Sequence, residues 1–466
     1  MPFAATGGLG DVVGSLGAAI KKKNEEADVR VVLPLYSAVD KYWRSQMTTE
    51  IIFTVKLGWR NQYCGILSLQ HNGVTYYFVD NEYYFKRDNL YGYGDDGERF
   101  AFFSMAAVQM LGEMGYYPDV IHANDWQSAA SIVYLETMYK EIPGYDSIKT
   151  VFTIHNIEYQ GKFPMEIMND VFGIPWKYAG LLEYEGSLNL VKAAVESADA
   201  VTTVSPRYAE EIQTDEYGCS LAPIIKNNAH KLSGILNGID VEVNNPHTDK
   251  VIAKKYMWRS ISGKKLNKAA LQEELGLPVK DVPVFAIISR LVSHKGMDLV
   301  RAVAHAMLFR FDCQIIVLGT GEYEYESFFR LLEDTFPEKA RALITYNRDL
   351  SRKVYAAADY FVMPSKSEPC GLAQMIASSY GTVPVTRETG GLYDSIKNYS
   401  VEKGVTTGNG LTFAEYSSNA LYAKIEDAMK LYRDQTEFRK LQQKIMKIDF
   451  SWGLSAEKYT ELYETL

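Results

Sequence analysis

The sequence predicts an α/β protein with two Rossmann-like domains that face one cleft. Short apolar runs alternate with helical stretches along most of the chain, which is the pattern of parallel strands joined by helices. With 466 residues, the chain is also too long for one ordinary domain core. Finally, a glycine motif occurs once in each half, as Thr6-Gly7-Gly8-Leu9-Gly10-Asp11 and as Thr389-Gly390-Gly391-Leu392-Tyr393-Asp394.

In the first half, the predicted parallel strands are Val29–Leu33, Val120–His122, Val151–Ile154 and Val201–Val204. The segment from Ile51 to Val79 differs, because its β-like runs IIFTVKL, YCGILSLQ and VTYYFVD have no helices between them. We expect this segment to form an antiparallel insertion or an edge of the sheet.

The second half repeats the strand-and-helix pattern from Pro283 onward. Its predicted strands are PVFAIIS, QIIVLGTG, ALITY, DYFVMPS and TVPVT. Between the two series, residues 234–250 are rich in Gly, Asn and Asp and contain one Pro. This composition is typical of a hinge-like connection between domains.

Composition argues against several other classes of protein. Hydrophobic residues make up 47% of the chain, and no apolar run approaches the ~18–20 residues of a membrane-spanning helix. The net charge of -9 argues against nucleic acid as a partner, because a phosphate backbone attracts basic surfaces. The four cysteines lack the spacing of a metal site and favour a reducing cytoplasm as the location.

The two glycine motifs are candidate ligand-binding loops. In each, the glycine pair is followed by helical sequence, VVGSLGAAI after the first and YDSIKNY after the second. Glycines let the backbone approach an oxygen-rich ligand, and the N-terminus of a helix behind them favours negative charge. The pair of loops, one in each half, therefore predicts two Rossmann-like domains that face one cleft.

Polar residues follow two predicted strands of the first half, in VIHANDWQ and FTIHN. Ligands bind at the carboxyl ends of strands in open α/β sheets, so His122, Asp125 and His155 lie where a site is expected. The alternative is that each histidine only hydrogen-bonds neighbouring backbone. For an isolated histidine we favour that alternative.

The second half carries charged residues at two further strand ends. Arg290 and Lys295 follow the strand PVFAII, and two permanent cations there can hold a diphosphate and stabilise it as a leaving group. The alternative, two solvated surface cations, is the usual outcome for such a pair. It is weakened here because Glu368 follows the strand FVMPS, beside a loop that precedes a helix. A carboxylate in that place can accept hydrogen bonds from sugar hydroxyls.

Together these runs resemble bacterial glycogen synthases and plant starch synthases. The matching runs, in the family's order over essentially the whole chain, are TGGLGDV, HANDW, FTIHN, TTVSPRYAEEI, GILNGID, SRLVSHKG, SEPCGL, RETGGL and DFSW. The resemblance implies the GT-B fold, with an acceptor-side domain over 1–240 and a nucleotide-sugar-binding domain over 241–450. A C-terminal helix over 451–466 would cross back to the first domain.

The resemblance also implies an activity. Glucose would be transferred from ADP-glucose to the non-reducing end of an α-1,4-glucan such as glycogen, with retention of configuration and without a metal or another cofactor. Retention without an obvious nucleophile is usually described as front-face attack assisted by the leaving phosphate.

Residue roles follow from the same resemblance. Arg290 and Lys295 would hold the donor diphosphate, Glu368 would bind the donor glucose, His155 would lie near the reacting carbon, and Asp125 would lie on the acceptor side. Tyr346 would stack on adenine. The remaining substrate-binding residues would be the backbone amides of Cys370, Gly371 and Leu372, and the two glycine loops with Thr6, Gly7, Gly8, Asp11, Thr389, Gly390 and Gly391.

Several positions depart from the family pattern. The usual lysine of the first loop is Ala5, and the usual histidine before Asp125 is Asn124, with Gln127 after Trp126. The usual Arg-Phe before Glu368 is Lys366-Ser367, and Ile376 replaces the second glutamate of the E-x7-E pattern of related transferases. These changes bear on donor affinity and nucleotide choice more than on the fold.

Other functions stay open. One is a catalytically weak glucan-binding relative, and another is a UDP-glucose-dependent glucosyltransferase. A glucan phosphorylase would need pyridoxal phosphate bound to a lysine.

One expectation concerns the start of the chain, because a phosphate loop normally follows a strand and only Met1–Ala5 precede Thr6. We expect the native chain to begin roughly 10–15 residues earlier, with Met1 an internal methionine.

Overall fold

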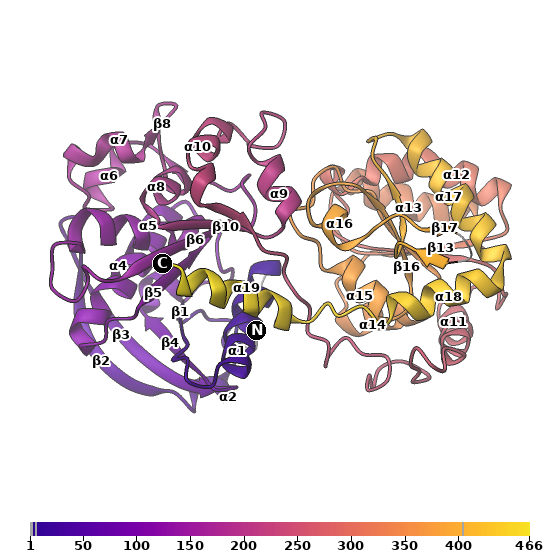
Figure 1. Ribbon diagram of the computed structural model, residues 1–466, viewed down its shortest axis with the longest axis horizontal. Coiled ribbons are helices and arrows are strands. Elements are labelled where there is room, and N and C mark those ends of the chain that lie inside the picture. Colours follow the sequence, from indigo (N-terminus) through magenta and orange to yellow (C-terminus); the bar gives the residue numbers. More distant parts are fainter. Residues whose placement is uncertain (1–2, 5–6, 403–404) are drawn as a thin grey trace. The chain divides into compact units, whose positions relative to one another are not determined.

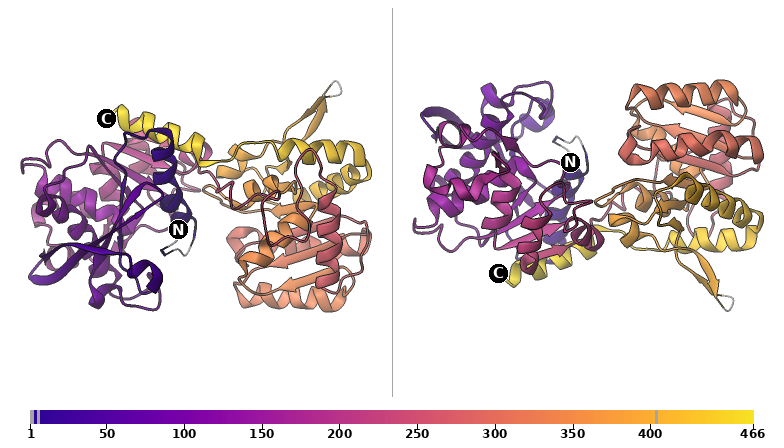
Figure 2. Two further views of the ribbon diagram at one scale, coloured as in Figure 1. Left: turned by 90° about the horizontal axis from the view of Figure 1, so that it is seen from below. Right: turned by 90° about the horizontal axis from the view of Figure 1, so that it is seen from above.

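The computed structural model describes residues 3–4, 7–402 and 405–466. Its contacts divide the chain into two compact units. The first unit comprises Met1–Asn237 and Trp452–Leu466, and the second comprises Gly238–Ser451 (Figure 1 and Figure 2). Each unit contains a parallel sheet with helices packed on it, so the predicted α/β class is confirmed. The boundary between the units falls inside the segment 234–250.

The parallel sheet of the first unit has the strand order β11-β10-β6-β5. Its strands are β5 (Val120–Asn124), β6 (Lys149–Ile154), β10 (Ala200–Thr203) and β11 (Leu232–Gly234). Helix α5 (Trp126–Tyr134) follows β5, and helix α8 (Leu190–Ser197) precedes β10. Every side chain of β10 is buried, as expected for a strand covered on both faces.

The second sheet of the first unit is mixed, with the order β1-β4-β3-β2. It consists of β1 (Arg30–Pro34), β2 (Thr48–Leu57), β3 (Arg60–His71) and β4 (Val74–Asp80). The strands β2, β3 and β4 pair antiparallel, and β1 pairs parallel with β4. The predicted antiparallel insertion is therefore confirmed. Phe3 packs beside this sheet, with its ring 4.8 Å from that of Tyr76 and 5.1 Å from that of Phe78.

Helix ends in the first unit follow local sequence signals. The hydroxyl of Ser205 accepts a hydrogen bond from Tyr208 N at 3.1 Å, and Pro206 occupies the first helical position of α9 (Pro206–Glu211). Gly115 ends α4 (Asp96–Met114) with a φ of 61°, a left-handed conformation that glycine adopts without strain. Further described elements are α2 (Lys41–Arg44), α3 (Glu82–Phe85), α6 (Ile167–Asp170), α7 (Ala179–Leu182), α10 (Ala222–Asn227), β7 (Lys162–Phe163), β8 (Glu183–Tyr184) and β9 (Ser187–Asn189).

The first and last described helices of the chain pack together in the first unit. Helix α1 (Gly8–Lys23) packs its apolar side against α19 (Trp452–Glu464), in a cluster that includes Val12, Leu16 and Tyr459. Figure 1 shows α19 lying beside α1 although more than 400 residues separate them in the chain. None of the described helices is long and apolar enough to cross a membrane.

The second unit is built on one parallel sheet with the order β14-β13-β12-β15-β16-β19. Its strands are β12 (Val284–Ile288), β13 (Gln314–Leu318), β14 (Ala340–Leu343), β15 (Tyr360–Met363), β16 (Val383–Arg387) and β19 (Leu411–Phe413). The predicted second strand series is thereby confirmed. The chain adds β13 and β14 on one side of β12 and later strands on the other side, so the strand order reverses between β12 and β15.

Helices cover both faces of this sheet. One buried cluster contains residues from α12 (Met297–Arg310), α13 (Tyr323–Thr335), α17 (Ser418–Arg433) and α18 (Gln435–Ile445). The cluster on the other face contains residues from α11 (Gly263–Glu274), α14 (Arg348–Ala357) and α15 (Ala373–Ser379). The short helix α16 (Gly390–Ser395) follows β16, and β17 (Ser400–Glu402) pairs antiparallel with β18 (Val405–Thr407).

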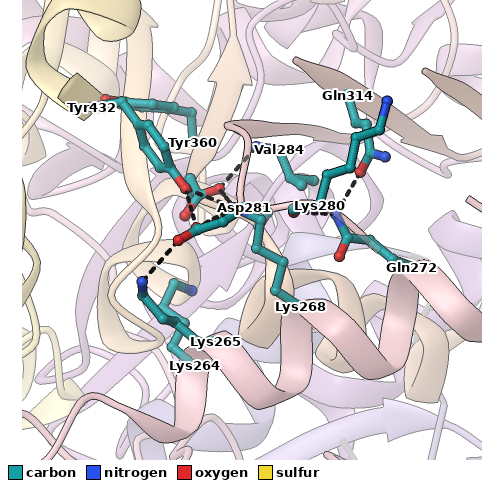
Figure 3. A network of polar contacts seen from close by, with 12 residues as sticks. Lys264, Lys265, Lys268, Gln272, Lys280, Asp281, Val284, Gln314, Tyr360 and Tyr432 are labelled. Atoms are coloured by element: carbon teal, nitrogen blue, oxygen red, sulfur yellow. Dashed lines mark hydrogen bonds and ion pairs between the residues drawn. The ribbon is translucent and has the colours of Figure 1, made fainter. Parts of the chain in front are cut away.

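A buried polar network attaches α11 to the sheet (Figure 3). The ammonium of Lys268 lies 2.7 Å from Asp359 Oδ2 and 2.9 Å from Tyr432 Oη. The same carboxylate accepts a hydrogen bond from Val284 N at 2.8 Å. Because both charged side chains are almost fully buried, each depends on the other for compensation.

Asp359→Asn should lower the free energy of unfolding by about 3 kcal/mol, because it leaves the buried Lys268 charge with only the more distant carboxylate of Asp281, at 4.0 Å, as a counter-ion. Urea denaturation measures this change. The matched control is Lys265→Met, which removes an ion pair to Asp281 whose side chains are 55% and 64% exposed. That control should cost less than about 1 kcal/mol. Equal losses for the two variants would contradict the assigned dependence.

Candidate active site

Three loops of the second unit lie at the carboxyl ends of neighbouring strands. The first follows β12 and carries Arg290 and Lys295, the second follows β15 and carries Glu368, and the third follows β16 and carries Thr389. Since β12, β15 and β16 are adjacent and the strand order reverses between β12 and β15, this edge is where a doubly wound sheet binds ligands.

Two of the predicted site residues form an ion pair. Lys295 Nζ lies 2.7 Å from Glu368 Oε2, and the hydroxyl of Ser365 donates to the same oxygen at 3.0 Å. The side chains are 17% and 9% exposed, respectively, so the pair is shielded from water but reachable at its rim. Arg290 is exposed at the end of β12. Another anion can therefore take the place of the Glu368 carboxylate as the partner of Lys295.

The loop after β16 packs backbone to backbone against the loop after β15. A Cβ atom on Gly390 would lie 2.1 Å from Glu368 O, and one on Gly391 would lie 2.1 Å from Cys370 O. Gly390 has a φ of 43°, in the left-handed region. The amide of Gly391 donates to Glu368 O at 3.1 Å. This glycine pair is therefore required for the contact between the two loops.

The first glycine loop is different. Gly7 and Gly8 are exposed at the start of α1, and a Cβ atom on either would meet no described atom within 4 Å. Asp11 lies in the first turn of α1, where a carboxylate interacts favourably with the helix dipole. Thr6 and Ala5 lie outside the described residues. Within the described part of the chain, one glycine pair of the repeated motif thus has no close neighbour, and the other packs against a neighbouring loop.

The remaining predicted residues of the second unit lie around these loops. Cys370 is buried, and Gly371 has a φ of 71° just before Leu372 and α15. Tyr346 follows β14, two strands from β12 in the sheet, and its side chain is 87% exposed. Two strand spacings correspond to about 10 Å. An exposed ring at that distance leaves a face on which a planar base can stack.

In the first unit, the structure brings Asp125 and His155 together at the ends of β5 and β6. His155 N donates to Asp125 Oδ1 at 2.8 Å, and the ring Nε2 of His155 lies 2.9 Å from Asn124 Oδ1. Asp125 N donates to Thr153 O at 2.9 Å. Asp125 has a φ of 57°, which is unusual for a residue with a side chain and stores backbone strain.

Burial changes the charges of both groups. It raises the pKa of Asp125 to about 7, although hydrogen bonds from the backbone of His155 and Asn156 act in the opposite direction. It lowers the pKa of His155 to about 4, so this imidazole is neutral at neutral pH. The edge of this sheet therefore presents a neutral histidine beside a carboxyl group that ionises near pH 7.

His122 has a structural role. Its Nδ1 lies 2.7 Å from Tyr463 Oη, and its Nε2 lies 2.5 Å from Thr153 Oγ1. The pKa of His122 is lowered to about 3 by burial and by the neighbouring His155. Both ring nitrogens therefore contact side chains, and not the neighbouring backbone that was considered as the alternative for this histidine. The contact to Tyr463, which lies 341 residues away, fixes α19 to β5.

The ionisation of Asp125 predicts a pH-dependent stability. In the unfolded chain this carboxyl loses its proton near pH 3.8, whereas in the folded protein it keeps the proton to about pH 7. The group therefore contributes stability that is full below pH 3.8 and is lost as the pH rises to 7, at a rate of at most ~1.4 kcal/mol per pH unit. Asp125→Asn removes this titration. The free energy of unfolding of this variant, minus that of the unsubstituted protein, should therefore increase between pH 5 and pH 8. A constant difference over that range would contradict the raised pKa.

Comparison with known proteins agrees with this geometry. The family model of the starch synthase catalytic domain matches residues 1–227, and that of glycosyl transferases group 1 matches residues 269–445. The chain is 45% identical to a glycogen synthase of Clostridioides difficile (strain 630), an alignment that covers 100% of this chain and 97% of that protein. The chain belongs to the glycogen and starch synthase family. A glycogen synthase of Ligilactobacillus salivarius (strain UCC118) is 44% identical over 100% of this chain and 98% of its own length.

Solved structures agree with the family assignment. The catalytic domain of starch synthase IV from Arabidopsis thaliana, bound to ADP and acarbose, has a TM-score of 0.90 at 33% identity and covers 100% of this chain and 97% of that one. A sucrose-phosphate synthase from Thermosynechococcus elongatus, at 16% identity and a TM-score of 0.61, shares the fold alone; it covers 99% and 94%, respectively. This glycogen/starch synthase relative is thus a retaining glycosyltransferase with the GT-B fold, as predicted. The roles of the individual site residues stay predictions.

Sequence reasoning missed three residues that support the site. Ser365 hydrogen-bonds Glu368, Asn124 contacts the ring of His155, and Tyr463 holds His122. The first lies close to a predicted residue and was visible only as part of a motif, and the second was noted only as a departure from the family pattern. The third gave no signal in the sequence.

Proposed function

We propose that the chain transfers glucose from ADP-glucose to the non-reducing end of an α-1,4-glucan such as glycogen, with retention of configuration. The observation that carries the proposal is the ion pair of Lys295 and Glu368 at the switch point of the sheet. It joins a cation suited to a diphosphate and a carboxylate suited to sugar hydroxyls. A nucleoside diphosphate sugar has these two parts adjacent.

The pair suggests how the donor binds. The diphosphate takes the place of Glu368 on Lys295, with Arg290 as the second cation, and the carboxylate of Glu368 then accepts hydrogen bonds from the glucose hydroxyls. As the bond from C1 to the phosphate oxygen breaks, C1 bonds the oxygen of a glucan hydroxyl, whose proton passes to the departing diphosphate. The two cations stabilise the charge that develops on this diphosphate. Because the loop after β16 is packed against that of Glu368, both loops approach the donor together.

The first unit contributes the neutral His155 and Asp125. A neutral imidazole near the reacting carbon adds no positive charge beside a developing oxocarbenium ion. We assign the acceptor side to Asp125, whose carboxyl group can accept a hydrogen bond from a glucan hydroxyl.

For the location we infer the cytoplasm, because the four cysteines of the chain are free thiols.

Incubation of the purified protein with labelled ADP-glucose or UDP-glucose, together with glycogen, tests the proposal. We expect label in the glycogen from ADP-glucose, released by an enzyme that cleaves α-1,4 links. Incorporation from UDP-glucose alone would overturn the donor assignment. Incorporation from neither donor, with binding to glycogen retained, would favour the catalytically weak glucan-binding relative.

A further inference from the structure

A buried glutamine lies between the two donor-binding loops of the second unit. Gln374 occupies the first turn of α15 and has no exposed surface. Its amide nitrogen lies 2.8 Å from Gly371 O, 3.2 Å from Cys370 O and 3.0 Å from Ser395 Oγ. All three neighbours are oxygens that can accept, so the amide nitrogen and not the amide oxygen faces them.

Ser395 continues the contact to the other loop. It is the last residue of α16, and its hydroxyl donates to Gly391 O at 2.6 Å. A chain of hydrogen bonds thus runs from the carbonyl groups of Cys370 and Gly371, through Gln374 and Ser395, to Gly391. We define these two side chains, Gln374 and Ser395, as the glutamine–serine bridge.

The bridge also fixes the direction of two backbone amides. In a planar trans peptide, the N–H group points opposite to the carbonyl group of the same peptide. When Gln374 holds the carbonyl groups of Cys370 and Gly371, the N–H groups of Gly371 and Leu372 point away from Gln374. These are two of the amides that we assign to the donor glucose.

The amide oxygen of Gln374 argues against a purely packing role. Among the described residues it has no hydrogen-bond partner, and it would lie only 2.6 Å from a Cβ atom added to Gly371. An unpaired buried amide oxygen costs free energy that an apolar side chain of the same length would avoid. The glutamine is therefore explained by what its nitrogen holds.

We propose that Gln374 is a positioning residue for the glucosyl donor, which acts through the backbone of the Cys370–Leu372 loop and, with Ser395, sets the spacing of the two donor-binding loops. The inference rests on the proposed function, because it takes both loops to bind the donor. It assigns no direct contact between Gln374 and the substrate.

Gln374→Met keeps the length of the side chain and removes the amide nitrogen. We expect the KM for ADP-glucose to rise about tenfold, because the two amides are assigned to its glucose, while the KM for glycogen stays unchanged. The Kd for ADP should rise as well, because the bridge also sets the position of the donor-binding loop after β16. The matched control is Gln272→Met, at an equally buried glutamine of the same unit that donates to Lys280 O and Gln314 Oε1 (Figure 3). This control should lower thermal stability without changing the Kd for ADP.

Ser395→Ala tests the second half of the bridge and removes only a hydroxyl group. We expect it to raise the Kd for ADP three- to tenfold. Both side chains act through one hydrogen-bond chain. The Kd for ADP of the double variant should therefore be no higher than that of the single variant with the higher Kd. If Gln374→Met does not fold, Ser395→Ala carries the test alone.

Normal ADP affinity in Ser395→Ala and Gln374→Met, or fully additive effects of the two, would overturn the inference. Equal weakening of ADP binding by Gln272→Met would also overturn it, because the effect would then be general destabilisation. Failure of the proposed function is recognised separately, since the unsubstituted protein would then not transfer glucose from ADP-glucose.

Discussion

Lys295→Ala should lower kcat/KM for ADP-glucose by about a hundredfold or more. The substitution removes the cation predicted to stabilise the departing diphosphate, which is worth ~1.5–3 kcal/mol as a charge-assisted contact. It also leaves Glu368 buried with only the hydroxyl of Ser365 on the oxygen that Lys295 now contacts. An uncompensated carboxylate there repels the diphosphate, so the loss should exceed that of a solvent-exposed cation. Steady-state kinetics with glycogen in excess measures the effect.

Two further variants sharpen this result. Glu368→Gln keeps the shape of the side chain and frees Lys295, so we expect a smaller loss, about 10- to 100-fold, with tighter binding of ADP than in Lys295→Ala. Lys353→Ala is the control and should keep normal kinetics, because Lys353 lies on α14 and pairs with Glu274 of α11. Near-normal turnover of Lys295→Ala would remove Lys295 from the catalytic site.

Both the strands and the separate halves of the site could be predicted from the sequence, because both depend on local pattern. The runs PVFAIIS and DYFVMPS are apolar over the length of a strand, and the polar residues after each run must lie at its carboxyl end. The roles of Lys295 and Glu368 were therefore expected one by one. Their direct contact was not, since it requires β12 and β15 to be neighbours although 73 residues separate the two side chains.

The remaining features depend on tertiary packing that no short motif encodes. A glutamine in a helical stretch gives no sign that it bridges two loops, and Tyr463 gives no sign of a bond to His122 across 341 residues. The glycine motifs are the clearest case. Both predicted a loop that approaches a ligand, but the surroundings of Gly7 and Gly391 differ, and the sequence cannot separate a ligand contact from a contact between loops.

This difference leads to the second large effect. Gly391→Ala should abolish detectable donor binding and lower the free energy of unfolding, because its Cβ atom would lie 2.1 Å from Cys370 O and 2.5 Å from Cys370 Cα, where ordinary contacts begin at 3.4 Å. Both neighbours are backbone atoms, so the Cys370 loop must move by about an ångström or more. Overpacking of this kind typically costs 1–3 kcal/mol.

The first loop supplies the contrast for that measurement. Gly8→Ala meets no described atom within 4 Å, and Gly8 is the first residue of α1. The substitution should therefore leave the free energy of unfolding unchanged or raise it by ~0.4–1 kcal/mol, through a less flexible unfolded chain. Any loss of ADP-glucose turnover in Gly8→Ala would then report on the approach of a ligand and not on packing. Urea denaturation together with donor kinetics distinguishes the two glycine pairs. Equal destabilisation by Gly8→Ala and Gly391→Ala would show that the first loop, like the second, is packed against protein.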